Sequence, residues 1–296
     1  MTGGASSSLV VCGLPSSGKT TFLAALWHLV QSGEVSTELK LNGLTFGDYE
    51  YVNTIRKRWL EGKRQPRTVG VARTIGIDLT HEAGVSLQLL FPDHSGETFD
   101  RLWATRDCDQ TIADHLSTRS GTLLFLRPES MKSPLPLADM LATEAEMMAA
   151  LPAGDATAAP TGPVKAWSAD DSPDQVKIVD ILQTLAHSLP TAGNDKLAIF
   201  VSAWDVVEDA KSPAEFVKRR MPLLDQYLRR SDHGFNYRFY GVSAQGGEYV
   251  EESHVGNLPD HLKGLLELEK ASARIKLVSG ASVSHDLTAP LVWLIS

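Results

Sequence analysis

The sequence has few cysteines, no long apolar run and no excess of positive charge. Among its 296 residues are only two cysteines, Cys12 and Cys108, too few for a disulfide framework or a cysteine-ligated zinc site. Apolar runs such as residues 123–126 are far too short to span a bilayer, and the first eight residues do not resemble a signal peptide. Because 28 basic residues face 36 acidic ones, we expect no nucleic-acid partner and no anionic-lipid surface. These absences predict a reduced, cytoplasmic protein without a membrane span.

Short apolar runs alternate with amphipathic stretches along most of the chain. Residues 8–12 are a buried-strand pattern that ends in glycine, and helical spacing of apolar residues follows over 20–30. Residues 69–80 and 85–91 both alternate apolar and polar side chains, which predicts an antiparallel hairpin. Further buried strands are predicted at 122–126, 197–201 and 237–242. This order predicts an α/β fold with a mainly parallel sheet, in which the hairpin supplies one antiparallel edge strand.

The pattern also divides the chain. We expect one domain over residues 1–250, with an Ala-, Pro- and acid-rich insertion at about 128–171 that contains a short helix over 137–151. Residues 251–296 are expected to form a C-terminal extension with the start of a closing helix. That helix stops sooner than a full flanking helix should, so we expect the chain to be a piece of a longer polypeptide.

Two helix starts and one helix break are marked by short motifs. Ser172 and Ser212 are each followed by proline and, three positions on, by Gln175 or Glu215, which fits a capping box. Pro222 is expected to kink or break the second of these helices, because proline lacks the backbone donor that a helix interior needs.

The strongest chemical signal is residues 13–20, GLPSSGKT, which match G-x-x-x-x-G-K-[ST] completely. Glycines let the backbone curl so that its N–H groups face phosphate oxygens, and the following helix adds its dipole. Lys19 is expected to reach the β- and γ-phosphates, and the Thr20 hydroxyl to bind magnesium. The buried strand before the motif and the amphipathic helix after it make this a predicted phosphate loop.

A second signal closes the predicted strand 85–91. Asp93 stands at the tip of that strand, where a carboxylate suits an outer contact to magnesium. Gly96, three residues further, leaves a backbone N–H free to meet a γ-phosphate. The spacing is the D-x-x-G pattern of GTPases, and its position beside the hairpin strengthens it.

Two later predicted strands are each followed by a polar loop. Together with the two loops above, they follow one another along the chain in the order expected of a single nucleotide site. Asp205 follows strand 197–201, and Ser243-Ala244 follows strand 237–242. With these four loops, residues 8–250 resemble the Ras-like P-loop GTPase superfamily. The short sequences around Asp93 and Asp205 are similar to those of the bacterial double-GTPase families. The resemblance implies a three-layer fold of Ras-like topology, GTP or GDP with Mg²⁺, and a nucleotide-dependent switch. The similarity to the double-GTPase families also implies a second GTPase as partner and work in bacterial conflict or defence.

The resemblance implies roles for the later loops, with departures. Asp205 would bridge guanine N1 and N2, and the backbone of Ser243 and Ala244 would read guanine O6. Ser202 and Ala203 replace the Asn/Thr and Lys that GTPases place before this aspartate, and Trp204 offers a stacking face instead.

The hydrolytic residues are less well defined by the sequence. Thr68 is favoured over Thr74 as the switch threonine, because Thr74 falls inside the predicted strand. Arg64 or Arg67 is a candidate internal arginine finger, although a solvated basic loop accounts for both. Glu97 stands where Gln or His usually orients water, and its charge opposes the γ-phosphate, which predicts slow hydrolysis.

The leading hypothesis is therefore a magnesium-dependent GTP-binding switch with slow, partner-stimulated hydrolysis. A non-hydrolysing nucleotide-binding interaction module is the alternative that Glu97 favours, and a P-loop ATPase or kinase is a third. The residues expected to bind nucleotide are Gly13, Ser16, Ser17, Gly18, Lys19, Thr20, Thr21, Gly96, Asp205, Ser243 and Ala244; those expected to bind metal are Thr20, Thr68 and Asp93; those expected to act in hydrolysis are Lys19, Glu97 and Thr68.

Overall fold

The computed structural model describes residues 7–66, 74–92, 95–128, 166, 168–189, 195–208, 210–230, 232, 234–251 and 258–296. Its strands are β1 (Ser7–Gly13), β2 (Leu39–Phe46), β3 (Thr74–His81), β4 (Ser86–Pro92), β5 (Gly121–Leu126), β6 (Asp195–Ser202), β7 (Phe235–Ser243), β8 (Lys276–Ser279) and β9 (Ser282–Ser284). Its α-helices are α1 (Lys19–Ser32), α2 (Tyr49–Leu60), α3 (Ser95–Thr105), α4 (Gln110–Ser117), α6 (Asp174–Gln183), α7 (Pro213–Arg220), α8 (Pro222–Leu228), α9 (Asp260–Leu266) and α10 (Ala289–Ile295).

The strands form one 9-stranded sheet in the order β2-β3-β4-β1-β5-β6-β7-β8-β9. Strands β4, β1, β5, β6 and β7 run parallel, which confirms the predicted α/β fold with a mainly parallel sheet. The antiparallel part is larger than the sequence indicates. β3 is antiparallel to β4 but is not an edge strand, since β2 pairs outside it, and β8 and β9 extend the opposite side.

The predicted hairpin is confirmed over its described residues. β3 and β4 pair from Thr74 with Pro92 to Thr80 with Ser86. Their apolar side chains alternate toward one core, as the period of two predicts. Residues 67–73, and with them the start of the predicted first strand, lie outside the described residues.

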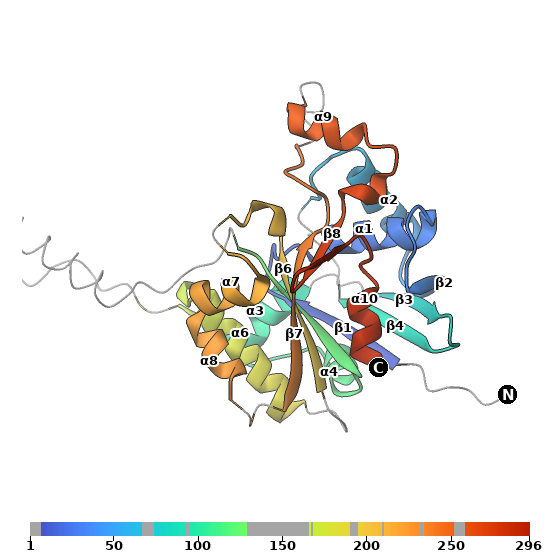
Figure 1. Ribbon diagram of the computed structural model, residues 1–296. Helices are drawn as coiled ribbons and strands as arrows, with labels where there is room; N and C mark the ends of the chain where they lie inside the picture. Colours follow the sequence, from blue (N-terminus) through green and yellow to red (C-terminus); the bar gives the residue numbers. More distant parts are fainter. Residues whose placement is uncertain are drawn as a thin grey trace, which may run out of the picture.

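Helices cover both faces of the sheet, so the fold has three layers (Figure 1). One core joins the sheet to α1, α2, α9 and α10, and the other joins it to α3, α4, α6, α7 and α8. β1 contributes to both, with Leu9 and Val11 in the first core and Val10 and Cys12 in the second. A strand buried on both faces reads as a continuous apolar run, which is why residues 8–12 could be recognised from the sequence.

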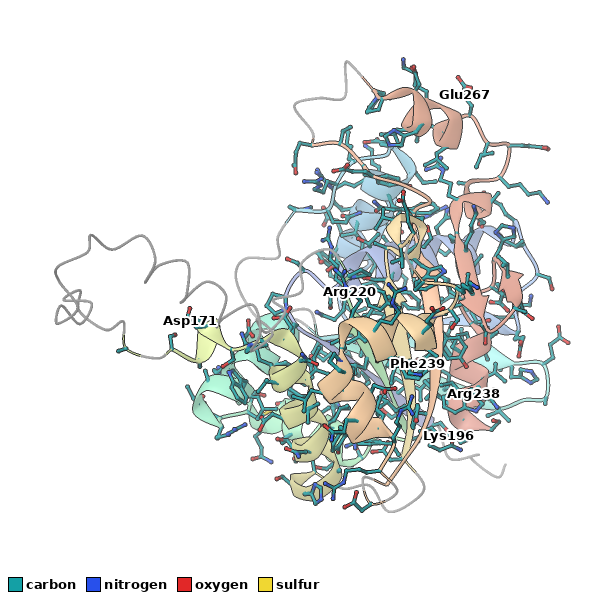
Figure 2. All side chains as sticks on the ribbon, turned by 60° about the vertical axis from the view of Figure 1, so that its left-hand side comes forward. Asp171, Lys196, Arg220, Arg238, Phe239 and Glu267 are labelled. Carbon is teal, nitrogen blue, oxygen red and sulfur yellow. The ribbon has the colours of Figure 1, made fainter. Side chains whose placement is uncertain are left out.

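The end of the chain packs on the same sheet. β8 pairs with the last residues of β7, and α10 lies against β1, β5 and β6. Lys196 and Arg238 hold cationic groups 5.9 and 4.7 Å from the centre of the Trp293 ring on α10. Figure 2 shows both of these basic residues in the same region of the sheet, beside α10. Pro290 lies in the first turn of α10, where the missing backbone N–H of proline costs no helical hydrogen bond.

The two marked helix starts behave differently. Ser212 accepts a hydrogen bond from the Glu215 backbone N–H at 3.2 Å, as predicted. The other helix is capped by Pro173 without a side-chain hydrogen bond, so that predicted capping box is wrong. Gln175 there accepts instead from the Leu223 N–H at 2.9 Å, a tertiary contact. The break at Pro222 is confirmed, because α7 ends at Arg220 and α8 begins at Pro222.

Most of the predicted insertion, including the helix expected over 137–151, lies outside the described residues. Within the described part of the chain, no helix combines the length and apolar character needed to cross a bilayer.

Candidate functional site

The candidate site lies where the parallel strands end. Because β4, β1, β5, β6 and β7 are parallel, their carboxyl ends meet at one edge of the sheet. Gly13, Ser202 and Ser243 stand at three of these ends. The topology thus brings the predicted phosphate loop and both predicted base loops to the same edge.

The phosphate loop needs its glycines for two reasons. Gly13 has φ +149°, and a Cβ there would come within 2.8 Å of the Phe125 carbonyl oxygen and of Ser17 Oγ. Gly18 has φ +92° and caps α1, and a Cβ there would come within 3.0 Å of Ser202. The loop is therefore packed tightly against the ends of β5 and β6, and the backbone turns where only glycine is unstrained.

Strained backbone is concentrated at this site. Of the three described non-glycine residues with positive φ, Ser16 lies in the phosphate loop and Ala203 lies directly after β6. Such conformations cost about 1–3 kcal/mol each and persist where the surrounding structure holds them. Two of these three conformations therefore lie on loops of the candidate site.

The amino end of α1 is open toward the loop. Phe22 N donates to the Gly18 carbonyl at 2.9 Å, so the N–H groups before Phe22 have no carbonyl one helical turn earlier. The helix has no side-chain cap and no acidic residue in its first turn. These N–H groups and the helix dipole favour an anion, which is the chemistry that a phosphate ligand requires.

Lys19 and Thr20 lie in the first turn of α1. Lys19 Nζ donates to the Gly13 and Leu14 carbonyls at 2.9 and 2.7 Å and to Ser17 Oγ at 3.0 Å, so the ammonium lies over the loop. The Thr20 side chain is half-buried at the same helix end. A hydroxyl oxygen here fits the preference of Mg²⁺ for oxygen ligands, whereas the other two predicted ligands, Thr68 and Asp93, lie outside the described residues.

The loop after β4 is described in part. α3 begins at Ser95, which places Gly96 and Glu97 in its first turn, where backbone N–H groups have no helical partner. α3 is tied to α6 by an ion pair between Lys177 Nζ and Asp100 at 3.2 Å. The Lys177 side chain is only 7% exposed, so this contact fixes the helix that carries Gly96.

The first base loop follows β6. Ser202 Oγ donates to the Leu126 carbonyl at 3.1 Å and lies against Gly18, so this side chain joins β5, β6 and the phosphate loop. Trp204 packs on Gly241, where a Cβ would come within 2.5 Å of the ring. The Trp204 ring is thereby engaged with β7, while Asp205 is exposed at the edge of the site.

The second base loop follows β7. Ser243 is buried, and its Oγ accepts from the Gly246 N–H at 3.2 Å. Ala244 is half-buried, and its carbonyl accepts from Trp59 Nε1 at 2.9 Å. Tyr249 is buried behind this loop, and burial raises the pKa of its phenol, whereas the hydrogen bond and the charge of Arg274 lower it.

A family comparison decides the assignment. The family model described as Double-GTPase 1 matches residues 10–294, nearly the whole chain. The chain belongs to the Double-GTPase 1 family. Membership in a GTPase family supports guanine-nucleotide binding and a GTPase switch, and it confirms the resemblance inferred from the four loops.

Solved GTPase structures align with this GTPase at low similarity. The Arl6 BBS3 small GTPase from Trypanosoma brucei, with bound GppNp, is 14% identical, with 80% of this chain and 87% of that chain covered and a TM-score of 0.36. The S. cerevisiae Ski7 GTPase-like domain bound to GTP is 16% identical, with 86% and 46% covered and a TM-score of 0.41. A search of curated proteins returned no match.

Several residues of the site were not recognised from the sequence. Trp59 has only the apolar spacing of a core residue in its helix, and the buried Arg274 and Tyr249 belong to no motif in the sequence. Arg64, a candidate arginine finger, donates to Glu248 at 2.7 Å and to Glu251 at 3.1 Å. Its guanidinium is therefore engaged with carboxylates, and the other candidate, Arg67, lies outside the described residues.

Proposed function

We propose that this GTPase is a magnesium-dependent molecular switch that binds GTP and hydrolyses it slowly. The observation that carries the proposal is the open amino end of α1, with its uncapped N–H groups and Lys19 facing the loop. In this proposal Gly13, Ser16, Ser17, Gly18, Lys19, Thr20 and Thr21 bind the phosphates. Catalysis rests on positioning and on neutralising charge, because phosphoryl transfer needs little covalent help from the protein.

Guanine recognition is proposed for the two base loops. Asp205 accepts from guanine N1 and N2, and the backbone of Ser243 and Ala244 binds at O6. The exposure of Asp205 and the burial of Ser243 support this assignment, because one loop offers an accessible acceptor and the other a fixed backbone. Ala203 supplies no long side chain over the base, so selectivity depends on these polar contacts.

Magnesium is assigned to Thr20, with Asp93 and Thr68 as the remaining protein ligands. When bound, the ion would neutralise negative charge on the phosphates. Gly96 contributes a backbone N–H toward the γ-phosphate from the first turn of α3, where that group has no helical partner.

The partner is proposed to be a protein. We propose a second GTPase, or another regulator, as this partner, working with the chain in the bacterial cytoplasm in a conflict or defence system. The description of the family as a double GTPase supports the second GTPase. Both cysteines are free, which accords with a reducing compartment. Cys12 lies next to the phosphate loop, and burial raises the pKa of its thiol to about 12, so it stays an inert core residue.

The nucleotide preference tests this proposal. We expect the chain to bind GTP and GDP more tightly than ATP, and Mg²⁺ to increase the affinity for GTP in equilibrium titrations. Asp205→Asn should weaken GTP binding about tenfold to hundredfold and shift preference toward xanthosine triphosphate, since an unpaired polar group costs about 1–3 kcal/mol. Equal binding of GTP and ATP by the parent protein would overturn guanine recognition.

The rate of hydrolysis separates a slow switch from a non-hydrolysing interaction module, which the charge of Glu97 also favours. If repulsion of the γ-phosphate dominates, Glu97→Gln should raise the single-turnover rate by at least several-fold, because the amide keeps the shape and removes the charge. If Glu97 orients water instead, the rate should fall. A parent protein that binds GTP but never releases phosphate would establish the interaction module.

A further inference from the structure

A tryptophan from a distant helix holds the second base loop. Trp59 is completely buried near the end of α2, and its Nε1 donates to the Ala244 carbonyl at 2.9 Å across 185 residues of sequence. On the other side of Ala244, Ser243 Oγ accepts from the Gly246 N–H at 3.2 Å. The loop is therefore held on both sides of the Ala244 Cα: Trp59 binds the carbonyl that follows it, and the preceding residue, Ser243, is tied to Gly246.

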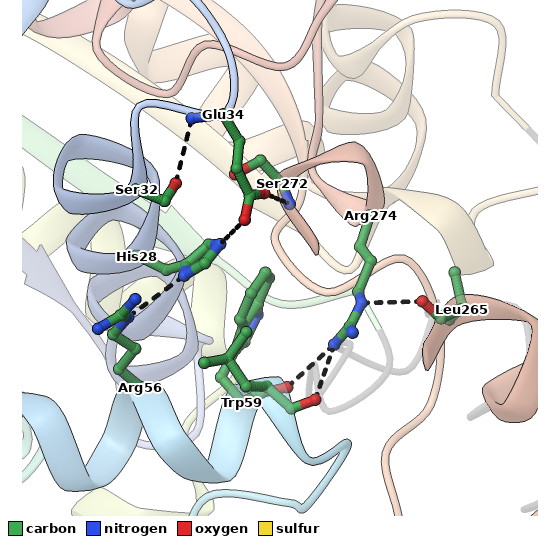
Figure 3. Close-up of polar contacts among 9 residues, drawn as sticks. His28, Ser32, Glu34, Arg56, Trp59, Leu265, Ser272 and Arg274 are labelled. Atoms are coloured by element: carbon green, nitrogen blue, oxygen red, sulfur yellow. Dashed lines mark hydrogen bonds and ion pairs between the residues drawn. The ribbon is translucent and has the colours of Figure 1, made fainter. Parts of the chain in front are cut away.

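Arg274 holds the tryptophan in turn (Figure 3). Its guanidinium carbon lies 5.3 Å from the centre of the Trp59 ring, and Nη1 donates to the Trp59 and Leu60 carbonyls at 3.3 and 3.2 Å. Its Nε donates to the Leu265 carbonyl at 3.0 Å. Arg274 is 4% exposed, so these hydrogen bonds are made away from water, where leaving the guanidinium unpaired would be costly. The end of α2 is thereby fixed to the segment after α9.

The base loop also packs directly on this arginine. Gly246 has φ +81°, and a Cβ there would come within 2.9 Å of the Arg274 carbonyl oxygen. Tyr249 Oη lies 3.4 Å from Arg274 Nη1. One buried arginine thus contacts the loop at Gly246 and Tyr249 and supports the tryptophan that binds Ala244.

We propose that Trp59, held by Arg274, is a positioning residue that holds the Ala244 carbonyl and thereby the backbone that presents the Ala244 N–H to the oxygen at position 6 of guanine. The inference rests on the proposed guanine recognition by Ser243 and Ala244. A backbone N–H discriminates between purines only when its direction is fixed before binding, and a loop that must be ordered by the ligand binds more weakly. A phenylalanine would fill most of the space of Trp59, but it could not donate to the Ala244 carbonyl.

The test compares GTP with 6-thio-GTP, in which sulfur replaces O6 and the rest of the base is unchanged. The full chain, Trp59→Phe and Trp27→Phe are titrated with both nucleotides, and their melting temperatures are recorded. Trp27 is a matched control, because it is also completely buried and its Nε1 donates to Asn53 Oδ1 at 3.0 Å, away from the base loop. Each variant therefore loses one buried indole donor.

We expect the wild-type chain to prefer GTP, and Trp59→Phe to reduce the ratio of GTP to 6-thio-GTP affinity about three- to tenfold, the range of one hydrogen bond. Trp27→Phe should leave that ratio unchanged. If Trp59→Phe does not fold, Trp59→β-(3-benzothienyl)alanine replaces only the indole N–H by sulfur and should give the same fall. Two results would overturn this inference and leave the proposed guanine recognition in place. One is an unchanged ratio in a folded Trp59 variant, and the other is a wild-type chain that prefers GTP over ATP but does not distinguish oxygen from sulfur. Equal affinity of the wild-type chain for GTP and ATP would overturn the proposed guanine recognition as well.

Discussion

The phosphate end and the base end of the site draw on different lengths of chain. Residues 13–20 supply the loop, the lysine and the open helix end from one contiguous stretch. The base end combines Asp205 and Ala244 with supports from Trp59 and Arg274, which come from opposite ends of the sequence. A local motif can be complete in eight residues, whereas the proposed base recognition requires the folded sheet to bring separate segments together.

This difference predicts that substitutions at the two ends change nucleotide binding in different ways. At the phosphate end, loss of one residue should weaken all nucleoside triphosphates alike, because every triphosphate presents the same oxygens. At the base end, loss of a support should change the choice among bases while leaving phosphate binding in place. Selectivity and affinity should therefore respond to separate sets of substitutions.

The largest effect is expected at Lys19. Lys19→Ala removes the ammonium that donates to the loop and that is expected to bind the phosphates, and GTP and ATP affinity should both fall about ten- to 150-fold, since hydrogen bonds to charged groups contribute about 1.5–3 kcal/mol. The ratio of GTP to ATP affinity should not change. Lys57→Ala, at a 77% exposed lysine, is the control. Unchanged affinity with an intact circular dichroism spectrum would disprove the assignment of the phosphate loop.

A smaller, selective effect is expected at Gly241. Gly241→Ala places a methyl group 2.5 Å from the Trp204 ring, which must move and take the neighbouring Asp205 with it. The GTP to ATP ratio should fall several-fold in competition titrations, with ATP affinity retained. Gly264→Ala is the control, because a Cβ at Gly264 in α9 has nothing within 4 Å. An equal loss of GTP and ATP affinity would show that the two ends are not separable.

The smallest effect is a pH dependence of stability at the base-end support. His28 is buried against the Trp59 ring at 5.1 Å, and burial lowers its pKa from 6.5 despite the opposing effect of Glu34, whose Oε1 lies 3.3 Å from His28 Nε2. The unfolded chain therefore takes up the proton first, and the free energy of unfolding should fall as the pH drops below about 6.5, by no more than about 1.4 kcal/mol per pH unit for one proton.

Urea unfolding of the parent and of His28→Gln at several pH values between 7 and 5 measures this contribution. Arg56 Nε donates to His28 Nδ1 at 3.2 Å, and the Arg56 and Arg274 charges also lower the pKa of the imidazole. The glutamine variant should lose less stability than the parent on acidification, since it has no proton to bind. Parallel pH profiles would show that His28 titrates alike in the folded and unfolded chain.

The sequence was sufficient to predict those structural features that depend on the residues of one short segment. Residues 13–20 define their loop because glycine, lysine and threonine act through their own backbone and first helical turn. The hairpin was predicted because alternation over β3 and β4 fixes both the strands and their register. Ser212 capped its helix as predicted, since that hydrogen bond spans three residues.

Tertiary structure decided the features that depend on contacts between segments far apart in the sequence. β2 has mixed polarity, half-exposed residues and Gly43, so its alternation is weak, and pairing with β3 makes it a strand. Gln175 has the spacing of a capping residue but binds the Leu223 N–H of α8. Trp59 carries only the signal of an apolar core residue, yet its N–H binds Ala244. Sequence therefore determined the phosphate loop and the central strands, whereas the support of the base loops depends on contacts between segments that only the folded chain brings within hydrogen-bonding distance.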